Sequence, residues 1–244
     1  MGRKELAPST VTFNTVMDTF ARSGQRGCER RAEVLLERME ELAIKHEYLR
    51  NRCQPDGISF NVVMNAWAQS NAHGAARRAD AILRHMERRW RVGDADLRPD
   101  VTAYNTVLTA WSRSRDPDAA SRAEALFDRM QKMWEADPEA AQPNVVSHNI
   151  LMNAIVKSGA PNGGKRALEI LSRLKESHQA DVVSYTSCLD ALAKEGTYDA
   201  SIQAERLLVE LERVYETSQE DHLQPNIRTY NSVSSLQLMI GRMI

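Results

Sequence analysis

Residues 99–130, PDVTAYNTVLTAWSRSRDPDAASRAEALFDRM, are the stretch that decides the fold. Its first half places apolar residues at i, i+3, i+4 and i+7, the spacing of one helix face: Tyr104, Val107, Leu108 and Trp111. Its second half repeats this spacing: Ala123, Leu126, Phe127 and Met130. Between the halves, residues 112–117 are polar, and Pro117 suits the first turn of a second helix. The stretch predicts two antiparallel amphipathic helices, which need neighbours because one hairpin cannot bury both apolar faces.

The same pattern recurs along the whole chain. Measured from Asn105, the matching residues are Asn14, Asn61, Asn149, Thr186 and Asn231. An alanine follows at one fixed distance in the first five copies: Ala32, Ala79, Ala123, Ala167 and Ala204. This constant register is typical of an internal repeat, so we expect an all-α array of helical hairpins. After a leader of residues 1–7 the array covers 8–244, with repeats starting near residues 8, 55, 99, 143 and 180 and a partial one at 225.

Each repeat is expected to contain a first and a second helix. The predicted pairs are 11–22 and 29–48, 58–69 and 75–90, 145–157 and 164–177, and 182–194 and 199–215. The sixth repeat has a first helix only, and its apolar end has no second helix to cover it. Because a finished array normally ends in a polar cap, we expect this chain to be part of a longer protein.

The composition limits the classes of partner. Lys+Arg 32 and Asp+Glu 33 give a formal net charge of -1. This balance argues against the broad basic patch of a non-specific nucleic-acid binder, but allows a protein that reads bases with a few placed side chains. The three cysteines lie far apart without metal-ligand spacing, and Cys188 is expected in the core. No apolar run is long enough to predict a membrane span, and the amino-terminal residues are too weakly apolar for a signal peptide.

The sequence offers no convincing catalytic motif. Residues 159–165 match G-x-x-x-x-G-K, but Arg166 stands where Ser or Thr must bind magnesium, and no strand is predicted before it. The six histidines form no H-E-x-x-H motif, and His148 occupies the aromatic register of the first helix. We therefore expect no catalytic residue, no metal site and no cofactor.

The repeated motifs resemble a known family. The lead-ins are variants of the run Pro-Asp/Asn-Val-x-Ser/Thr-Tyr/Phe-Asn, followed by an apolar helix, a Ser-Gly turn at 23–24 and 158–159, and an Ala-x-x-Leu-Leu/Phe-x-x-Met helix. Together they resemble the pentatricopeptide repeat from residue 8 to about residue 240. The long units containing Trp67 and Trp111 are similar to those of algal and protist members.

This resemblance implies both a fold and a function. The fold is a right-handed α-solenoid, a superhelix of antiparallel helix-turn-helix repeats with the first helices on its concave face. The function is sequence-specific binding of single-stranded RNA, one nucleotide per repeat. The implied setting is organellar RNA metabolism (processing, stability or translation) in a mitochondrion or plastid, rather than the cytoplasm.

In the family two residues read each base: the Asn or Thr early in the first helix, and the last residue before the next repeat. The implied pairs are Asn14 with Asp56, Asn61 with Asp100, Asn105 with Asn144, Asn149 with Asp181, and Thr186 with Asn226; Asn231 has no visible partner. A carboxylate accepts the imino N–H of uracil or guanine, whereas an amide donates to the bare ring nitrogen of cytosine or adenine. By the family's code the pairs resemble 5′-UUCUA-3′.

Two further sets of residues match roles in the family. The base-wedging set is Val11, Ile58, Thr102, Val146 and Val183, and the phosphate set is Arg22, Arg113, Lys157 and Lys194. Every set has a plainer alternative. The Asn residues suit an inter-repeat hydrogen bond, their partners suit helix N-caps, the wedge positions suit helix packing, and the basic residues suit the helix dipole.

The main alternative function is a helical scaffold whose groove binds a protein segment. The two alternatives imply different partners: single-stranded RNA in one case and other proteins in the second. Neither requires a membrane.

Overall fold

The computed structural model describes residues 8–46, 49, 52–159 and 162–240, apart from the side chains of 235–240. Within these residues the chain forms α-helices and two short 3-10 helices, and no strand. It divides into two compact units, the first of Met1–Asp116 with Asp128–Gln142 and the second of Pro117–Phe127 with Pro143–Ile244. None of the described helices has both the length and the apolar character needed to cross a bilayer.

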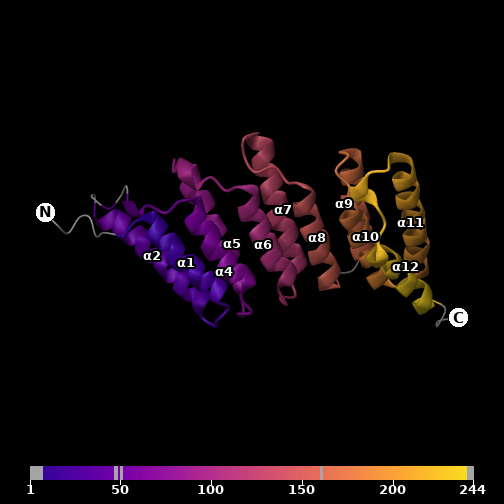
Figure 1. Ribbon diagram of the computed structural model, residues 1–244, viewed down its shortest axis with the longest axis horizontal. Helices are drawn as coiled ribbons and strands as arrows, with labels where there is room; N and C mark the ends of the chain where they lie inside the picture. Colours follow the sequence, from indigo (N-terminus) through magenta and orange to yellow (C-terminus); the bar gives the residue numbers. More distant parts are fainter. Residues whose placement is uncertain (1–7, 47–48, 50–51, 160–161, 241–244) are drawn as a thin grey trace. The chain divides into compact units, whose positions relative to one another are not determined.

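The first unit stacks its hairpins in chain order (Figure 1). Its elements are α1 (Thr10–Ser23), α2 (Cys28–Lys45), α4 (Gly57–Gln69), α5 (Ala75–Arg91), η1 (Ala95–Leu97), α6 (Val101–Arg113) and the second part of α7 (Ala119–Ala136). The first helices α1, α4 and α6 pack in succession, while α2 and α5 pack against them. This sequential packing is what the repeated apolar faces predicted.

The second unit has the same organisation. Its elements are the first part of α7, α8 (Val145–Ser158), α9 (Gly163–Glu176), α10 (Val182–Glu195), α11 (Tyr198–Ser218), η2 (Asp221–Leu223) and α12 (Ile227–Ile240). Here α10 is central, because it packs against α8, α9, α11 and α12.

The helix boundaries follow from local chemistry. The first helices of the first five repeats begin at polar N-caps in extended backbone: Ser9, Asp56, Asp100, Asn144 and Asp181. Three of them end at glycines with positive φ: Gly24, Gly159 and Gly196. Glycine adopts this left-handed backbone without the steric cost that a Cβ would add.

Three predicted boundaries differ from the structure. The polar break was expected to begin at Ser112, but α6 continues to Arg113, and Ser112 is buried, so its side chain belongs to the packed face. Pro117 was expected in the first turn of the next helix, yet α7 starts only at Ala119, and Pro117 lies in the turn before it. The first repeat's second helix ends at Lys45 rather than near 48, and residues 47–48 lie outside the described part of the chain.

The predicted core register is confirmed. The repeated alanines of the second helices are all 0% exposed: Ala32, Ala79, Ala123, Ala167 and Ala204. The aromatic residues that come directly before Asn14, Asn61, Asn105 and Thr186 are also buried: Phe13, Phe60, Tyr104 and Tyr185. The apolar faces of these hairpins therefore form the core. Cys188 lies in this core as expected, and burial raises the pKa of its thiol to about 12, which leaves it unreactive at neutral pH.

A buried charge cluster joins the second and third repeats inside the first unit. Arg129 Nη2 lies 2.7 Å from Asp80 Oδ1, and its Nε lies 3.1 Å from Glu87 Oε1 without the angle of a hydrogen bond. The Tyr104 hydroxyl donates to Glu87 Oε1 at 2.9 Å, and burial together with this carboxylate raises the Tyr104 pKa. Asp80 also pairs with Arg84, whose Nη2 lies 3.0 Å from Asp80 Oδ2, so removing Arg129 would leave chiefly the buried Glu87 without a counter-ion, which is costly at low dielectric.

We predict that Arg129→Met lowers the free energy of unfolding by about 3 kcal/mol, because Glu87 stays buried and loses its counter-ion, while Asp80 loses one of its two and keeps Arg84. Urea unfolding followed by circular dichroism measures the change. The matched control is Arg38→Met, whose ion pair with Glu41 is exposed and should contribute less than about 0.5 kcal/mol. Equal effects of the two substitutions would contradict a structural role for the buried cluster.

Ion pairs also connect second helices of successive repeats. Glu33 pairs with Arg78 in the first unit, and Glu124 with Arg166 in the second. Both acids directly follow the repeated alanine, as does Asp80 in the charge cluster. Sequence reasoning overlooked this register, although the recurrent acid after the alanine was a visible signal.

His148 takes the place of an aromatic residue and is half-buried. Its ring meets Phe127 edge-on with centroids 4.7 Å apart, and its Nδ1 lies 2.9 Å from the carbonyl oxygen of Asn144. Burial lowers the pKa of His148, and Arg173 adds to this effect, while the hydrogen bond to Asn144 opposes it. The folded protein therefore favours the neutral imidazole.

We predict that His148→Phe reduces the loss of stability in mild acid. Because the folded-state pKa lies below the unfolded value of about 6.5, the unfolded chain binds more protons, and stability falls as the pH drops through that range. Comparing urea midpoints at about pH 7.5 and about pH 5.5 measures the effect. An unchanged pH dependence in His148→Phe would contradict the assignment.

Candidate functional site

The predicted base-reading pairs are in contact where both residues belong to one unit and the first residue is Asn. Asn14 Nδ2 donates to Asp56 Oδ1 at 3.2 Å, and Asn149 Nδ2 donates to Asp181 Oδ1 at 3.2 Å. The contact from Asn61 Nδ2 to Asp100 Oδ1 is longer, at 3.5 Å. The structure therefore shows the inter-repeat hydrogen bond that was the plainer explanation for Asn in a helix interior.

The partner residues are also N-caps. Asp56, Asp100, Asn144 and Asp181 each accept a backbone N–H from the third residue of the following helix, at 2.7–3.0 Å. Asn226 does the same for Thr229 at 3.2 Å. Each partner residue is thus the N-cap of a first helix. The three aspartates also accept a hydrogen bond from the Asn of the preceding repeat.

Capping leaves half of each carboxylate available. In Asp56 and Asp100 these bonds go to Oδ1, and among the described residues Oδ2 accepts none. In Asp181, Oδ2 has only the 3.5 Å contact from Asn149 Nδ2. A carboxylate has two oxygens and about four acceptor positions, so capping and ligand binding do not exclude each other.

A pocket of about 680 Å³ opens beside the second pair, and its lining includes Asp56, Ile58, Asn61 and Asp100. It thus brings together residues predicted to read a base and a residue predicted to wedge against one. Arg98 also lines the pocket and pairs with Asp137 and Glu139. Sequence reasoning missed Arg98, although a cation two residues before Asp100 was visible.

The predicted wedge residues project into solvent instead of packing between helices. Val11 is 71% exposed, Ile58 62%, Val146 50% and Val183 47%, and Thr102 is exposed as well. Helix packing, the alternative explanation for these positions, would have buried them. Large aliphatic side chains kept exposed at one helical register are consistent with a contact to a ligand.

The predicted phosphate residues lie in the last turns of first helices and are exposed: Arg22, Arg113, Lys157 and Lys194. Two of them have partners within the protein. Arg22 Nε lies 2.7 Å from Asp18, and Lys194 Nζ donates to the carbonyl oxygen of Val156 at 2.6 Å. For Lys194 the structure therefore shows a role at the end of the neighbouring helix α8.

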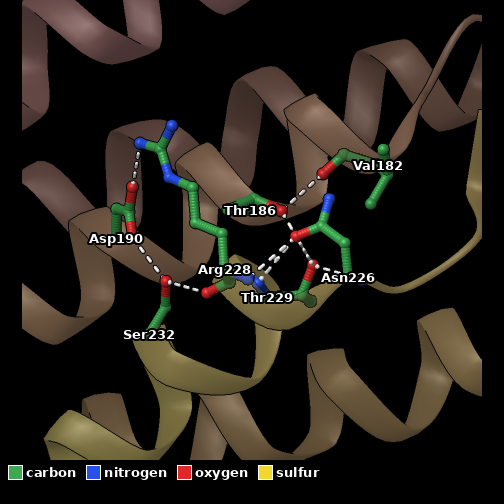
Figure 2. Close-up of polar contacts among 7 residues, drawn as sticks. All are labelled: Val182, Thr186, Asp190, Asn226, Arg228, Thr229 and Ser232. Atoms are coloured by element: carbon green, nitrogen blue, oxygen red, sulfur yellow. Dashed lines mark hydrogen bonds and ion pairs between the residues drawn. The ribbon is translucent and has the colours of Figure 1, made fainter.

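The remaining base-reading residues are arranged differently. Asn105 is half-buried in α6 of the first unit, and Asn144 caps α8 in the second unit. Thr186 and Asn226 are joined through Thr229, whose Oγ1 lies 3.1 Å from Thr186 Oγ1 and donates to Asn226 Oδ1 at 3.3 Å (Figure 2). Asn231 is exposed on α12.

Further polar contacts, which the sequence did not predict, join α10 and α12 near the pair of Thr186 and Asn226. Arg228, which lies three residues before Asn231 as the wedge residues lie before the other Asn and Thr positions, pairs with Asp190 at 2.7 Å (Figure 2). Ser232 Oγ donates to the other oxygen of Asp190 at 2.5 Å. The hydroxyl of the buried Thr186 also donates to the carbonyl oxygen of Val182. Polar contacts thus connect α12 to α10, against which it packs.

No group of three or more His, Cys, Asp or Glu side chains that could hold a metal ion occurs within the described residues.

Comparison with known proteins gives a match to one family model: residues 81–158 match the model of the pentatricopeptide repeat domain. This segment resembles a pentatricopeptide repeat domain. A search of curated proteins found no match.

Solved pentatricopeptide repeat proteins share the fold. The crystal structure of the pentatricopeptide repeat protein PPR10 from maize aligns with a TM-score of 0.56 at 20% identity, over 99% of this chain and 30% of that one. A structure of PPR10 in complex with an 18-nt psaJ RNA element has a TM-score of 0.47 at 20% identity, over 98% of this chain and 35% of that one. The chain thus spans about a third of those proteins, and the first likeness confirms the all-α helical-repeat fold.

We predict that Asp56→Ala lowers the free energy of unfolding by about 1–2 kcal/mol, because α4 loses its N-cap and Asn14 loses its acceptor. Asp56→Asn keeps an oxygen for both bonds and should cost only a few tenths of a kcal/mol. Thermal unfolding of both variants beside the wild type measures the difference. Equal losses would contradict capping as the structural role of this side chain.

Proposed function

We propose that this chain binds single-stranded RNA sequence-specifically, with one nucleotide placed at each Asn or Thr position of the first helices. The observation that carries the proposal is the pocket at the second pair. There an exposed aliphatic side chain, Ile58, lies beside the carboxamide of Asn61 and the open carboxylate oxygens of Asp56 and Asp100. An apolar surface for a base face next to donors and acceptors for its edge is how single-stranded RNA is recognised.

The polar groups of this pocket fit uracil. The imino N–H of uracil needs an acceptor, which Asp100 Oδ2 supplies without giving up the bonds made by Oδ1. The carbonyl oxygens of uracil need donors, and Asn61 Nδ2 has a second proton besides the one directed at Asp100. The same reasoning applies to Asn14 with Asp56 and, through Asp181, to Asn149.

The remaining positions are proposed from the pairing alone. Asn105 with Asn144 would favour cytosine. Thr186 with Asn226 would favour adenine, because Asn226 Nδ2 donates to no described residue and can serve a bare ring nitrogen. The proposed core is therefore 5′-UUCUA-3′, with Arg113 and Lys157 as phosphate contacts. The family resemblance further implies that the natural target is an organellar transcript.

We predict that a 5′-UUCUA-3′ RNA binds roughly 30-fold or more tightly than 5′-UUUUG-3′, since each wrong base costs about 1–3 kcal/mol and two bases differ. Fluorescence anisotropy at fixed salt measures both dissociation constants. Equal or absent binding of the two RNAs would contradict the proposal and favour a protein-binding scaffold.

We predict that the double variant Asn105→Thr, Asn144→Asp changes the preference at the third position from cytosine to guanine, because a carboxylate replaces the amide that would face the ring nitrogen. The measurement compares the four RNAs that differ only in the third base. The four RNAs with changes at the first base are the control, and their ranking should stay as in the wild type. An unchanged third-position ranking would contradict the assigned pair.

A further inference from the structure

Each predicted base-reading pair is accompanied by one completely buried residue. It is the third residue of the first helix in the following repeat, which we call the third-position residue. Ser59, Ala103, Ser147, Ser184 and Thr229 occupy it and are all 0% exposed. Each donates its backbone N–H to the N-cap side chain, but their side chains differ in what they offer to the Asn or Thr of the preceding repeat.

Ser59 holds the carboxamide of Asn14 from its oxygen side. Ser59 Oγ lies 2.7 Å from Asn14 Oδ1 and 2.9 Å from Asp56 Oδ1, and it has one proton to donate. Asp56 Oδ1 already accepts from Ser59 N and Asn14 Nδ2, whereas Asn14 Oδ1 has no other donor among the described residues. Asn14 is therefore fixed at both ends, by Asp56 at its nitrogen and by Ser59 at its oxygen.

Asn61 and Asn149 are held at the nitrogen only. Ala103 has no hydroxyl, and Ser184 Oγ directs its bond to Asp181 Oδ1 at 2.7 Å. The Oδ1 atoms of both Asn61 and Asn149 are buried without a hydrogen-bond partner. Rotation about the terminal torsion of Asn is soft, so a carboxamide bound at one end turns more easily than one bound at both.

We infer that the third-position residue is a positioning residue, which determines how rigidly the Asn of the preceding repeat is presented to a base. This inference rests on the proposed RNA-binding function and extends it from two residues per site to three. A preorganised donor–acceptor pair rejects a wrong base more strongly than one that can turn to suit it. The first site, with Ser59, should therefore discriminate more strongly between bases than the second site, with Ala103.

The first test needs no RNA. Side-chain amide relaxation measured by NMR reports the order of each Asn NH₂ group in the free protein. We expect Asn14 to be more ordered than Asn61, Ser59→Ala to lower the order of Asn14, and Ala103→Ser to raise that of Asn61. Equal order in the wild type, or no response to either substitution, would overturn the inference.

Ser184→Ala is the matched control. It removes a hydroxyl that bonds to the same N-cap atoms as Ser59 does, yet touches no Asn carboxamide. Both serine variants should lower the thermal midpoint by similar amounts, because both lose one capping contact. The order of Asn149 should stay unchanged in Ser184→Ala, which separates positioning from stability.

The second test measures discrimination between uracil and cytosine at single positions. Ser59→Ala should reduce the first-position ratio of dissociation constants about tenfold, and Ala103→Ser should raise the second-position ratio by a similar factor, the worth of one hydrogen bond. If the wild type binds RNA and these ratios do not move, the inference fails and the proposed function stands. If the wild type binds no RNA, the proposed function fails, and the amide order alone decides whether the third position fixes the Asn.

Discussion

The stacking of the first helices depends on a hydrogen bond from one repeat to the next, made at the three pairs whose Asn and Asp belong to one unit. An Asn in the first helix donates to the carboxylate that starts the following first helix, as Asn14 does to Asp56 and Asn149 to Asp181. The same oxygen caps the helix, so the contact sets both the beginning of one helix and its position against the previous one. Apolar stripes supply most of the burial energy, but such stripes tolerate sliding, whereas a directed hydrogen bond does not.

Under the proposed function, the same residues would make a structural contact and face the RNA. In Asp56 and Asp100 the capping hydrogen bonds all go to Oδ1, and Oδ2 accepts none from the described residues. Aliphatic residues such as Val11 and Ile58 remain exposed at the adjacent register, although burial would be favourable if packing were their purpose. The proposed RNA surface would therefore need no basic face, which agrees with a near-neutral chain.

Much of this organisation could be predicted from the sequence, because a periodic pattern constrains every copy at once. The repeat register, the buried alanines and the N-caps followed from spacing and residue type alone. The pattern could not show that Ser59 reaches Asn14 while Ser184 turns to Asp181, since identical residues differ there by side-chain orientation. Nor could it place Arg129 between Asp80 and Glu87, or Thr229 between Thr186 and Asn226, which depends on how neighbouring helices are offset.

The most direct test of the account is a crystal structure of this chain with an RNA containing 5′-UUCUA-3′. The account predicts that the second uracil lies in the pocket against Ile58, with its imino nitrogen within hydrogen-bond distance of Asp100 Oδ2 and a carbonyl oxygen near Asn61 Nδ2, while the bond from Ala103 N to Asp100 Oδ1 persists. RNA bound along the second helices, or a base that displaces Asp100 from its helix end, would contradict it.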